Sequence, residues 1–217
     1  MYLSSVFLLL LYVALARPAS HVSSEDDNQT WKVTRLDYHY MTEWPGFGPP
    51  HTEWPEGRKF NSTISLDVQI PDELAPGSNW VYKCDMNWEH SVLPGISADC
   101  IPQSIHKHVH DNVAFFVEPW QIPGKDLPPG SPAEMPFSLT IQKTSVTQSW
   151  GPARRWLGNV TISCDDPGSP SSYLTCLTGP PFDGMRCKLG AINNIDLSNK
   201  TELQVFAQEV CDSTASC

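Results

Sequence analysis

Three histidines alternate in one short stretch of the chain and form its clearest candidate for chemistry. His106, His108 and His110 stand two residues apart, and Asp111 follows directly. Side chains two residues apart on a β-strand project from the same face, so the three imidazoles would point the same way. Imidazole is a common ligand of zinc and copper. The spacing therefore indicates a metal site or, alternatively, a pH-responsive cluster, because close imidazoles repel one another once protonated.

One straight strand does not bring all three histidines to a single ion. His106 and His110 would stand about 13 Å apart at the usual rise of a strand. Two of the three can bind together, and a further ligand must then come from another segment, such as His39 or His51. The plain alternative is that the three histidines form the solvent face of an ordinary surface strand.

Two long, proline-rich loops carry aromatic residues that are candidates for binding. Residues 42–55 hold Trp44, Phe47 and Trp54 within a repeated Thr-Glu-Trp-Pro, and residues 119–136 hold Trp120. Aromatic side chains on stiff loops lose little entropy when they stack on a sugar ring or fill a receptor pocket. They predict a carbohydrate- or protein-binding surface. The alternative is that the loops fold back and cover one end of the domain with their indoles.

The signatures of common enzyme classes are missing from the sequence. It contains no Gly-x-Ser-x-Gly elbow, no P-loop, no His-Glu-x-x-His and no Gly-x-Gly-x-x-Gly. We therefore assign no catalytic residue and favour a protein that is not an enzyme. A secreted metal-dependent protein or hydrolase built on the three histidines is the alternative, and zinc or copper would then be its cofactor.

The N-terminus has the pattern of a secretory signal peptide. Residues 1–16 form an apolar run that ends in Ala14-Leu15-Ala16, and small residues at these two alanine positions are typical of a cleavage site. No later stretch reaches the roughly 18 apolar residues of a membrane span. We expect a secreted, extracellular chain that begins at Arg17 and has no membrane span.

Glycosylation motifs and net charge indicate what such a chain meets outside the cell. Four Asn-x-Thr sequons begin at Asn28, Asn61, Asn159 and Asn199. Each glycosylated asparagine must face solvent. The 24 acidic and 14 basic residues give a net charge of −10, which repels nucleic acid. We expect a protein or carbohydrate partner at a cell or host surface.

All seven cysteines lie in the predicted mature chain, where an oxidising compartment favours disulfides. We expect cysteines close in sequence to pair: Cys84 with Cys100, Cys164 with Cys176, and Cys187 with Cys211. Cys217 then remains near the terminus, where it would be unpaired or would link two chains.

Hydrophobic periodicity predicts an all-β fold. Apolar and polar residues alternate in runs bounded by proline or glycine, which predicts strands within residues 31–40, 61–70, 104–119, 137–143 and 158–164. The first of these runs has a break in register. Twenty prolines leave little room for long helices. We expect a disulfide-stabilised antiparallel β-sandwich or barrel.

Composition and hydrophobic periodicity together predict four parts of the chain. After the signal peptide, residues 17–30 are acidic and polar and predict a flexible leader. Residues 31–190 form the β domain, and residues 191–217 form a C-terminal extension. A short helix is expected over residues 198–211, where apolar residues recur at helical spacing behind an Asn199 cap. A terminal strand is the alternative.

The order of these features resembles a known family. Trp31-Lys-Val-Thr-Arg-Leu36 is followed by Val68-Gln-Ile-Pro71, Tyr82-Lys-Cys84, Phe137-Ser-Leu-Thr-Ile141 and Gly158-Asn-Val-Thr-Ile162. Over residues 31–189 this layout resembles the small secreted proteins of filamentous fungi that are grouped with the Alternaria major allergen. The resemblance implies a β-barrel and a non-enzymatic role as an effector or elicitor at the fungal surface or host interface. The two aromatic loops, the extra cysteines and the C-terminal extension depart from the family, and no site residue is carried over from it.

Overall fold

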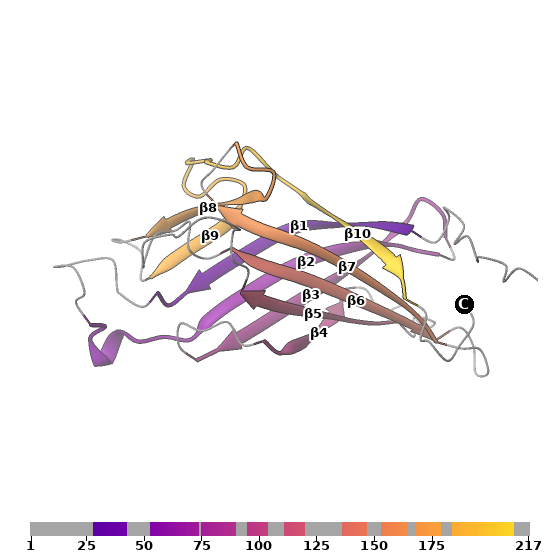
Figure 1. Ribbon diagram of the computed structural model, residues 1–217, viewed down its shortest axis with the longest axis horizontal. Helices are drawn as coiled ribbons and strands as arrows, with labels where there is room; N and C mark the ends of the chain where they lie inside the picture. Colours follow the sequence, from indigo (N-terminus) through magenta and orange to yellow (C-terminus); the bar gives the residue numbers. More distant parts are fainter. Residues whose placement is uncertain are drawn as a thin grey trace, which may run out of the picture.

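The computed structural model describes residues 28–42, 53–73, 75–89, 95–103, 111–119, 136–146, 153–164, 168–178 and 184–210. The predicted signal peptide lies outside these ranges. Ten strands and one short 3-10 helix, η2, make up the described fold (Figure 1). In chain order they are β1 (Asn28–Tyr40), η2 (Glu56–Arg58), β2 (Ser62–Pro71), β3 (Asn79–Trp88), β4 (Ser97–Pro102), β5 (Asp111–Pro119), β6 (Phe137–Val146), β7 (Ala153–Cys164), β8 (Ser172–Thr178), β9 (Met185–Leu189) and β10 (Leu203–Glu209). The prediction of an all-β fold is confirmed.

All ten strands belong to one sheet that closes on itself. Strands β1 to β9 are neighbours in sequence order, and β1 pairs again with β9. The remaining strand, β10, pairs with both β1 and β7. Every pairing is antiparallel except that of β7 with β8, which is parallel. The pairings therefore trace a closed circuit, which leaves fewer open edges than a flat sheet has.

Strand β1 is connected to β7 in two ways, through β10 alone and through β9 and β8. The first residues of β1, from Asn28 to Val33, pair with β10, whereas Asp37 to Tyr40 pair with β9. Figure 1 shows β10 toward one end of the molecule and β8 with β9 toward the other. This division decides which side chains meet on the outer surface near β9.

The strand pattern follows from side-chain alternation. In β2, Ile64, Leu66, Val68 and Ile70 are buried, as the period of two predicts. In β1 the register against β2 shifts between Val33 and Arg35. This β-bulge is the predicted break, and it returns Tyr38 and Tyr40 to the inside.

The interior is filled by large side chains from every part of the sheet. The largest fully buried apolar residues are Trp31, Trp156, Tyr38, Tyr82, Phe115, Phe137, Leu36, Ile64, Leu66, Ile70 and Leu139. They form one continuous cluster, so one core serves the whole described fold.

The C-terminal helix that the sequence predicts does not form between Leu203 and Glu209. These residues are strand β10, and its burial alternates strictly, with Leu203, Val205 and Ala207 inside. The apolar residues satisfy both periods, and the open hydrogen bonds of β1 and β7 decide in favour of the strand. Part of the predicted extension therefore belongs to the sheet, and so does the end of the predicted leader, because β1 begins at Asn28.

Candidate functional site

The outer face of β2, β1 and β9 carries an ordered array of polar side chains. His39 is paired with Thr63 of β2 on one side and with Arg186 of β9 on the other. Two residues back along β1, Asp37 is paired with Ser65 and with Lys188 in the same way. Side chains at alternate positions share a face, so these six residues form two rows of three. We call them the outer array.

The outer array lines a shallow hollow in the surface. Its volume is about 270 Å³, and the six array residues, Tyr38, Cys187 and Ile192 line it. Ile192 comes from the turn after β9, which is closed by paired backbone hydrogen bonds between Ile192 and Ile195. The hollow thus combines charged, hydroxyl and imidazole groups with one aliphatic wall.

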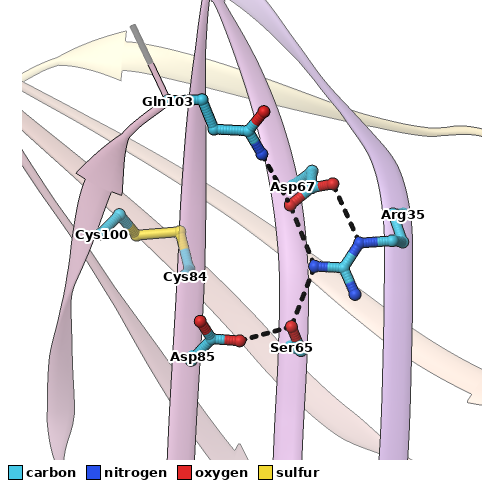
Figure 2. The surroundings of a disulfide bond; sticks show 7 residues. All are labelled: Arg35, Ser65, Asp67, Cys84, Asp85, Cys100 and Gln103. Carbon is cyan, nitrogen blue, oxygen red and sulfur yellow. Dashed lines mark hydrogen bonds and ion pairs between the residues drawn. A yellow bond between two sulfur atoms is a disulfide. The ribbon is translucent and has the colours of Figure 1, made fainter. Parts of the chain in front are cut away.

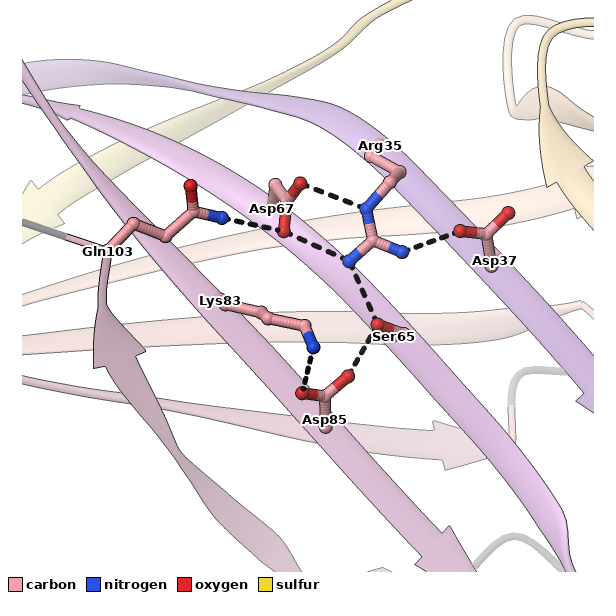
Figure 3. Close-up of polar contacts among 7 residues, drawn as sticks. All are labelled: Arg35, Asp37, Ser65, Asp67, Lys83, Asp85 and Gln103. Carbon is pink, nitrogen blue, oxygen red and sulfur yellow. Dashed lines mark hydrogen bonds and ion pairs between the residues drawn. The ribbon is translucent and has the colours of Figure 1, made fainter.

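Arg35 organises the surface beside the hollow. Its Nε and Nη2 donate to the two carboxylate oxygens of Asp67 at 2.9 and 3.0 Å, and its Nη1 donates to Asp37 at 2.6 Å (Figure 3). Its Nη2 also donates to Ser65 Oγ at 2.9 Å. These hydrogen bonds, first that of Asp67, raise the pKa of Arg35 above its usual range. The bidentate pair holds the guanidinium in one orientation.

The polar contacts extend from Arg35 across β2 to β3, and to Gln103 after β4, whose Nε2 donates to Asp67 Oδ1 at 3.4 Å. Ser65 donates to Asp85, and this hydrogen bond is the main reason that the pKa of Asp85 is lowered. Lys83 also pairs with Asp85, at 3.2 Å. Figure 2 shows the disulfide between Cys84 and Cys100 beside this network, joining directly opposed residues of β3 and β4. The outer surface next to the hollow is therefore well fixed.

Aromatic residues hold one edge of the hollow. The ring of His39 stacks on Phe60, with centroids 4.2 Å apart and planes 13° from parallel. Phe60 meets Trp54 edge to face, and Trp54 Nε1 donates to the carbonyl of Thr42 at 2.7 Å. Trp54 is only 6% exposed. Its indole is thus covered, so Trp54 is not presented for stacking on a ligand.

A second group of charges lies at the end of the sheet where β1 begins. Lys143 is 2% exposed, and its Nζ lies 2.8 Å from Glu73 Oε1 and 3.3 Å from Asp111 Oδ2. Arg154 donates to both oxygens of Glu209, at 2.8 and 2.7 Å. Its guanidinium also lies 3.7 Å from Glu73. We call these five residues the end cluster.

The end cluster gathers around one indole and joins several strands. The ring of Trp156 lies 4.7 Å from Lys143 Nζ and 4.6 Å from the guanidinium carbon of Arg154. The residues come from β5, β6, β7, β10 and the turn after β2, so the cluster ties these segments together. Its buried ammonium is matched by two carboxylates, as a buried charge requires. We therefore place the candidate binding site at the outer array.

Most of the other residues predicted to bind metal or ligands lie outside the described part of the chain, whereas the four sequon asparagines lie within it. His106, His108 and His110 lie outside the described residues, as do Trp44, Phe47 and Trp120. Within the described ranges, no three His, Cys, Asp or Glu side chains gather closely enough to hold a metal ion. Asn28, Asn61, Asn159 and Asn199 are all exposed, as their modification would require. No helix in the described part of the chain is long and apolar enough to cross a membrane.

The predicted disulfides are partly wrong. Cys84 pairs with Cys100 as expected, but Cys176 pairs with Cys187 rather than with Cys164. Cys176 and Cys187 stand directly opposite each other on β8 and β9, with Cα atoms 4.0 Å apart. Cys164 is buried at the end of β7. The bond between Cys176 and Cys187 also excludes the predicted bond between Cys187 and Cys211. Cys211 and Cys217 lie outside the described residues.

The residues of the outer array were not singled out as a site by their sequence pattern, except for His39. Arg186 and Lys188 alternate around Cys187, which marks a short half-buried strand, but nothing local places that strand beside β1. Comparisons with protein-family models, with curated proteins and with solved structures find no match to this chain.

Proposed function

We propose that this protein is a secreted, glycosylated binding protein that acts outside the cell, as an effector- or elicitor-like protein of a fungal surface or host interface, and that it is not an enzyme. The outer array is its proposed contact surface. The observation that carries the proposal is the hollow itself, because it gathers residues of three strands at a concave, well-fixed part of the outer surface. Concave sites with a few converging polar groups are where ligands and partners bind most often.

Three further features support export and binding. Two disulfides staple neighbouring strands, which suits an oxidising compartment. The four sequon asparagines are exposed. Inside the sheet, large apolar side chains form one continuous cluster, so the candidate surface lies on the outside.

Export and modification are tested first on the natively secreted protein. Mass spectrometry should find a mature chain that begins at Arg17 and carries N-linked glycans. A chain that keeps residues 1–16, or one without any glycan, would contradict the proposed export route.

Binding is tested with a charge-reversed surface. The natively secreted protein is immobilised, and its retention of components from cell-wall and host-tissue extracts is compared between variants. Arg186→Glu with Lys188→Glu should abolish retention. Lys32→Glu with Lys59→Glu makes the same change in charge at two exposed lysines outside the hollow, and it should retain the same components as wild type. Equal loss in both double variants would reject the outer array as the contact surface.

A further inference from the structure

We infer that the hollow binds a hydroxylated carboxylate, such as the uronate residue of an acidic glycan. This inference rests on the proposed function and names the ligand class of the same surface. It follows from the charge of the hollow, from its hydroxyl groups and from its size.

The lining of the hollow is positive although the protein is acidic. Arg186 and Lys188 contribute two cations from β9, and both are exposed. Asp37 is the single acidic residue among those that line it, and its carboxylate lies 2.6 Å from Arg35. The whole chain carries a net charge of −10. A concave positive site on a negative protein concentrates small anions and discriminates against neutral molecules.

The cations favour a carboxylate. A guanidinium presents a planar pair of donors that matches the two oxygens of a carboxylate, and an ammonium adds a point charge beside it. Arg186 and Lys188 stand two residues apart on β9, so their side chains project from the same face. They can therefore approach one anionic group from the same side.

The remaining groups suit the hydroxyls and the C–H surface of a sugar ring. Thr63 and Ser65 present hydroxyls from β2, and His39 presents an imidazole between β2 and β9. Ser65 Oγ already accepts from Arg35 and donates to Asp85, which fixes its orientation. Ile192 adds an aliphatic contact.

The size of the hollow limits the ligand. Its volume of about 270 Å³ is slightly below the roughly 300–1,000 Å³ typical of sites for drug-sized molecules. One sugar ring therefore fills it, and the rest of a longer glycan would continue over the outer surface. An isolated ring should bind weakly, with a Kd on the order of 1 mM, because a shallow site excludes little water.

The test uses the full secreted chain with three probes: D-galacturonate, D-galactose and inorganic phosphate. Nuclear magnetic resonance or calorimetry at low salt measures each Kd. Galacturonate should bind at least about tenfold more tightly than galactose, which has a hydroxymethyl group in place of the carboxylate. Galacturonate should also bind more tightly than phosphate, because phosphate brings charge without the ring that Thr63, Ser65 and Ile192 would contact.

Variants locate the site. Arg186→Gln and Lys188→Gln should each weaken galacturonate binding about tenfold, the loss expected for one charge-assisted contact. Lys32→Gln removes an exposed cation that does not line the hollow and has no contact with its polar network, and its Kd should stay within about twofold of wild type. Circular dichroism, together with detection of the two disulfides by peptide mapping without reduction, checks that each variant is folded.

The outcomes separate this inference from the proposed function. Equal affinity for galacturonate and galactose, or unchanged affinity in both variants, would overturn the ligand class. Phosphate that binds as tightly as galacturonate would reduce the hollow to a simple anion site and would also overturn it. If extract components still depend on Arg186 and Lys188 after such a result, the proposed binding function stands and only its ligand is different.

Discussion

The ammonium nitrogen of Lys143 lies 2.8 Å from Oε1 of Glu73, at the end of the sheet where β1 begins. Lys143 belongs to β6, whereas Glu73 belongs to the turn between β2 and β3. The contact therefore joins two segments that are far apart along the circuit of strands. Because Lys143 is buried, its charge depends on Glu73 and Asp111 for compensation.

Removal of one partner of this pair should be costly. Glu73→Ala leaves the buried ammonium with a single carboxylate, and we expect it to lower the free energy of unfolding by about 3 kcal/mol. Lys143→Met with Glu73→Ala should be more stable than Glu73→Ala alone, because the fully buried ammonium is then gone and only Asp111, which is less buried, loses its partner. Urea denaturation measures both. Lys83→Met, which breaks an exposed pair with Asp85, should change stability by less than about 1 kcal/mol. If Glu73→Ala has only this small effect, the end cluster does not stabilise the fold.

Acid should weaken the same end of the sheet. Hydrogen bonds from Arg154 lower the pKa of Glu209. Burial acts to raise the pKa of Glu73, but hydrogen bonds from Lys143 and Gln29 and the charges of Lys143 and Arg154 together lower it. The folded state therefore binds fewer protons than the unfolded state. The stabilisation is complete above the ordinary glutamate pKa of about 4.3 and is lost as the pH falls through the lowered values.

Urea midpoints between pH 7 and pH 3 test this dependence. The midpoint of wild type should fall steeply below about pH 4.3, and Glu209→Gln should flatten the decline because it removes one of the two groups. Glu202→Gln removes an exposed carboxylate near the start of β10 and serves as the control. Identical slopes in wild type and Glu209→Gln would contradict the prediction.

The position of β10 between β1 and β7 can be tested at one glycine. A Cβ at Gly158 of β7 would stand 2.6 Å from Val205 Cγ1 of β10. Gly158→Ala should therefore destabilise the protein by about 1–3 kcal/mol through overpacking. Gly57→Ala is the matched control, because a Cβ there meets no atom within 4 Å. A thermal melt in which both variants behave alike would mean that β10 does not pack against β7.

Peptide mapping without reduction checks the disulfides. Proteolysis of the secreted protein should release one linked pair of peptides with Cys84 and Cys100 and another with Cys176 and Cys187. Replacement of either pair by alanine should cost about 3 kcal/mol, because each bond closes a loop of similar, modest length in the unfolded chain. A linked peptide that joins Cys164 to Cys176 would mean that Cys176 does not pair with Cys187.

Glycan occupancy follows from the exposure of the four sequons. Single Asn→Gln changes at positions 28, 61, 159 and 199 should each remove the mass of one glycan. Asn61 is of special interest, because Thr63 completes its sequon and also lines the hollow. Asn159 is a second test, since its amide nitrogen donates to Ser138 and Thr140. Unchanged mass in a variant would show that its site is unoccupied.

The sequence alone was sufficient for those features that depend on local periodicity. The alternation of Ile64, Leu66 and Val68 predicts the inner face of β2 without any knowledge of its neighbours. The break in β1 and the pairing of Cys84 with Cys100 are also visible locally. The strand β3 could have been found in the same way, because Tyr82, Cys84, Met86 and Trp88 alternate with polar residues.

Only the tertiary structure decided which segments became neighbours. Cys187 pairs with Cys176 because β8 and β9 are adjacent, and Lys188 lies opposite Asp37 because β9 returns to β1. The apolar residues around Val205 fit a helix and a strand equally well, and hydrogen-bonding groups of β1 and β7 selected the strand. Periodicity is a property of one segment, whereas the closing of a sheet is a property of the whole chain. The core strands were therefore predictable from the sequence, and the outer array was not.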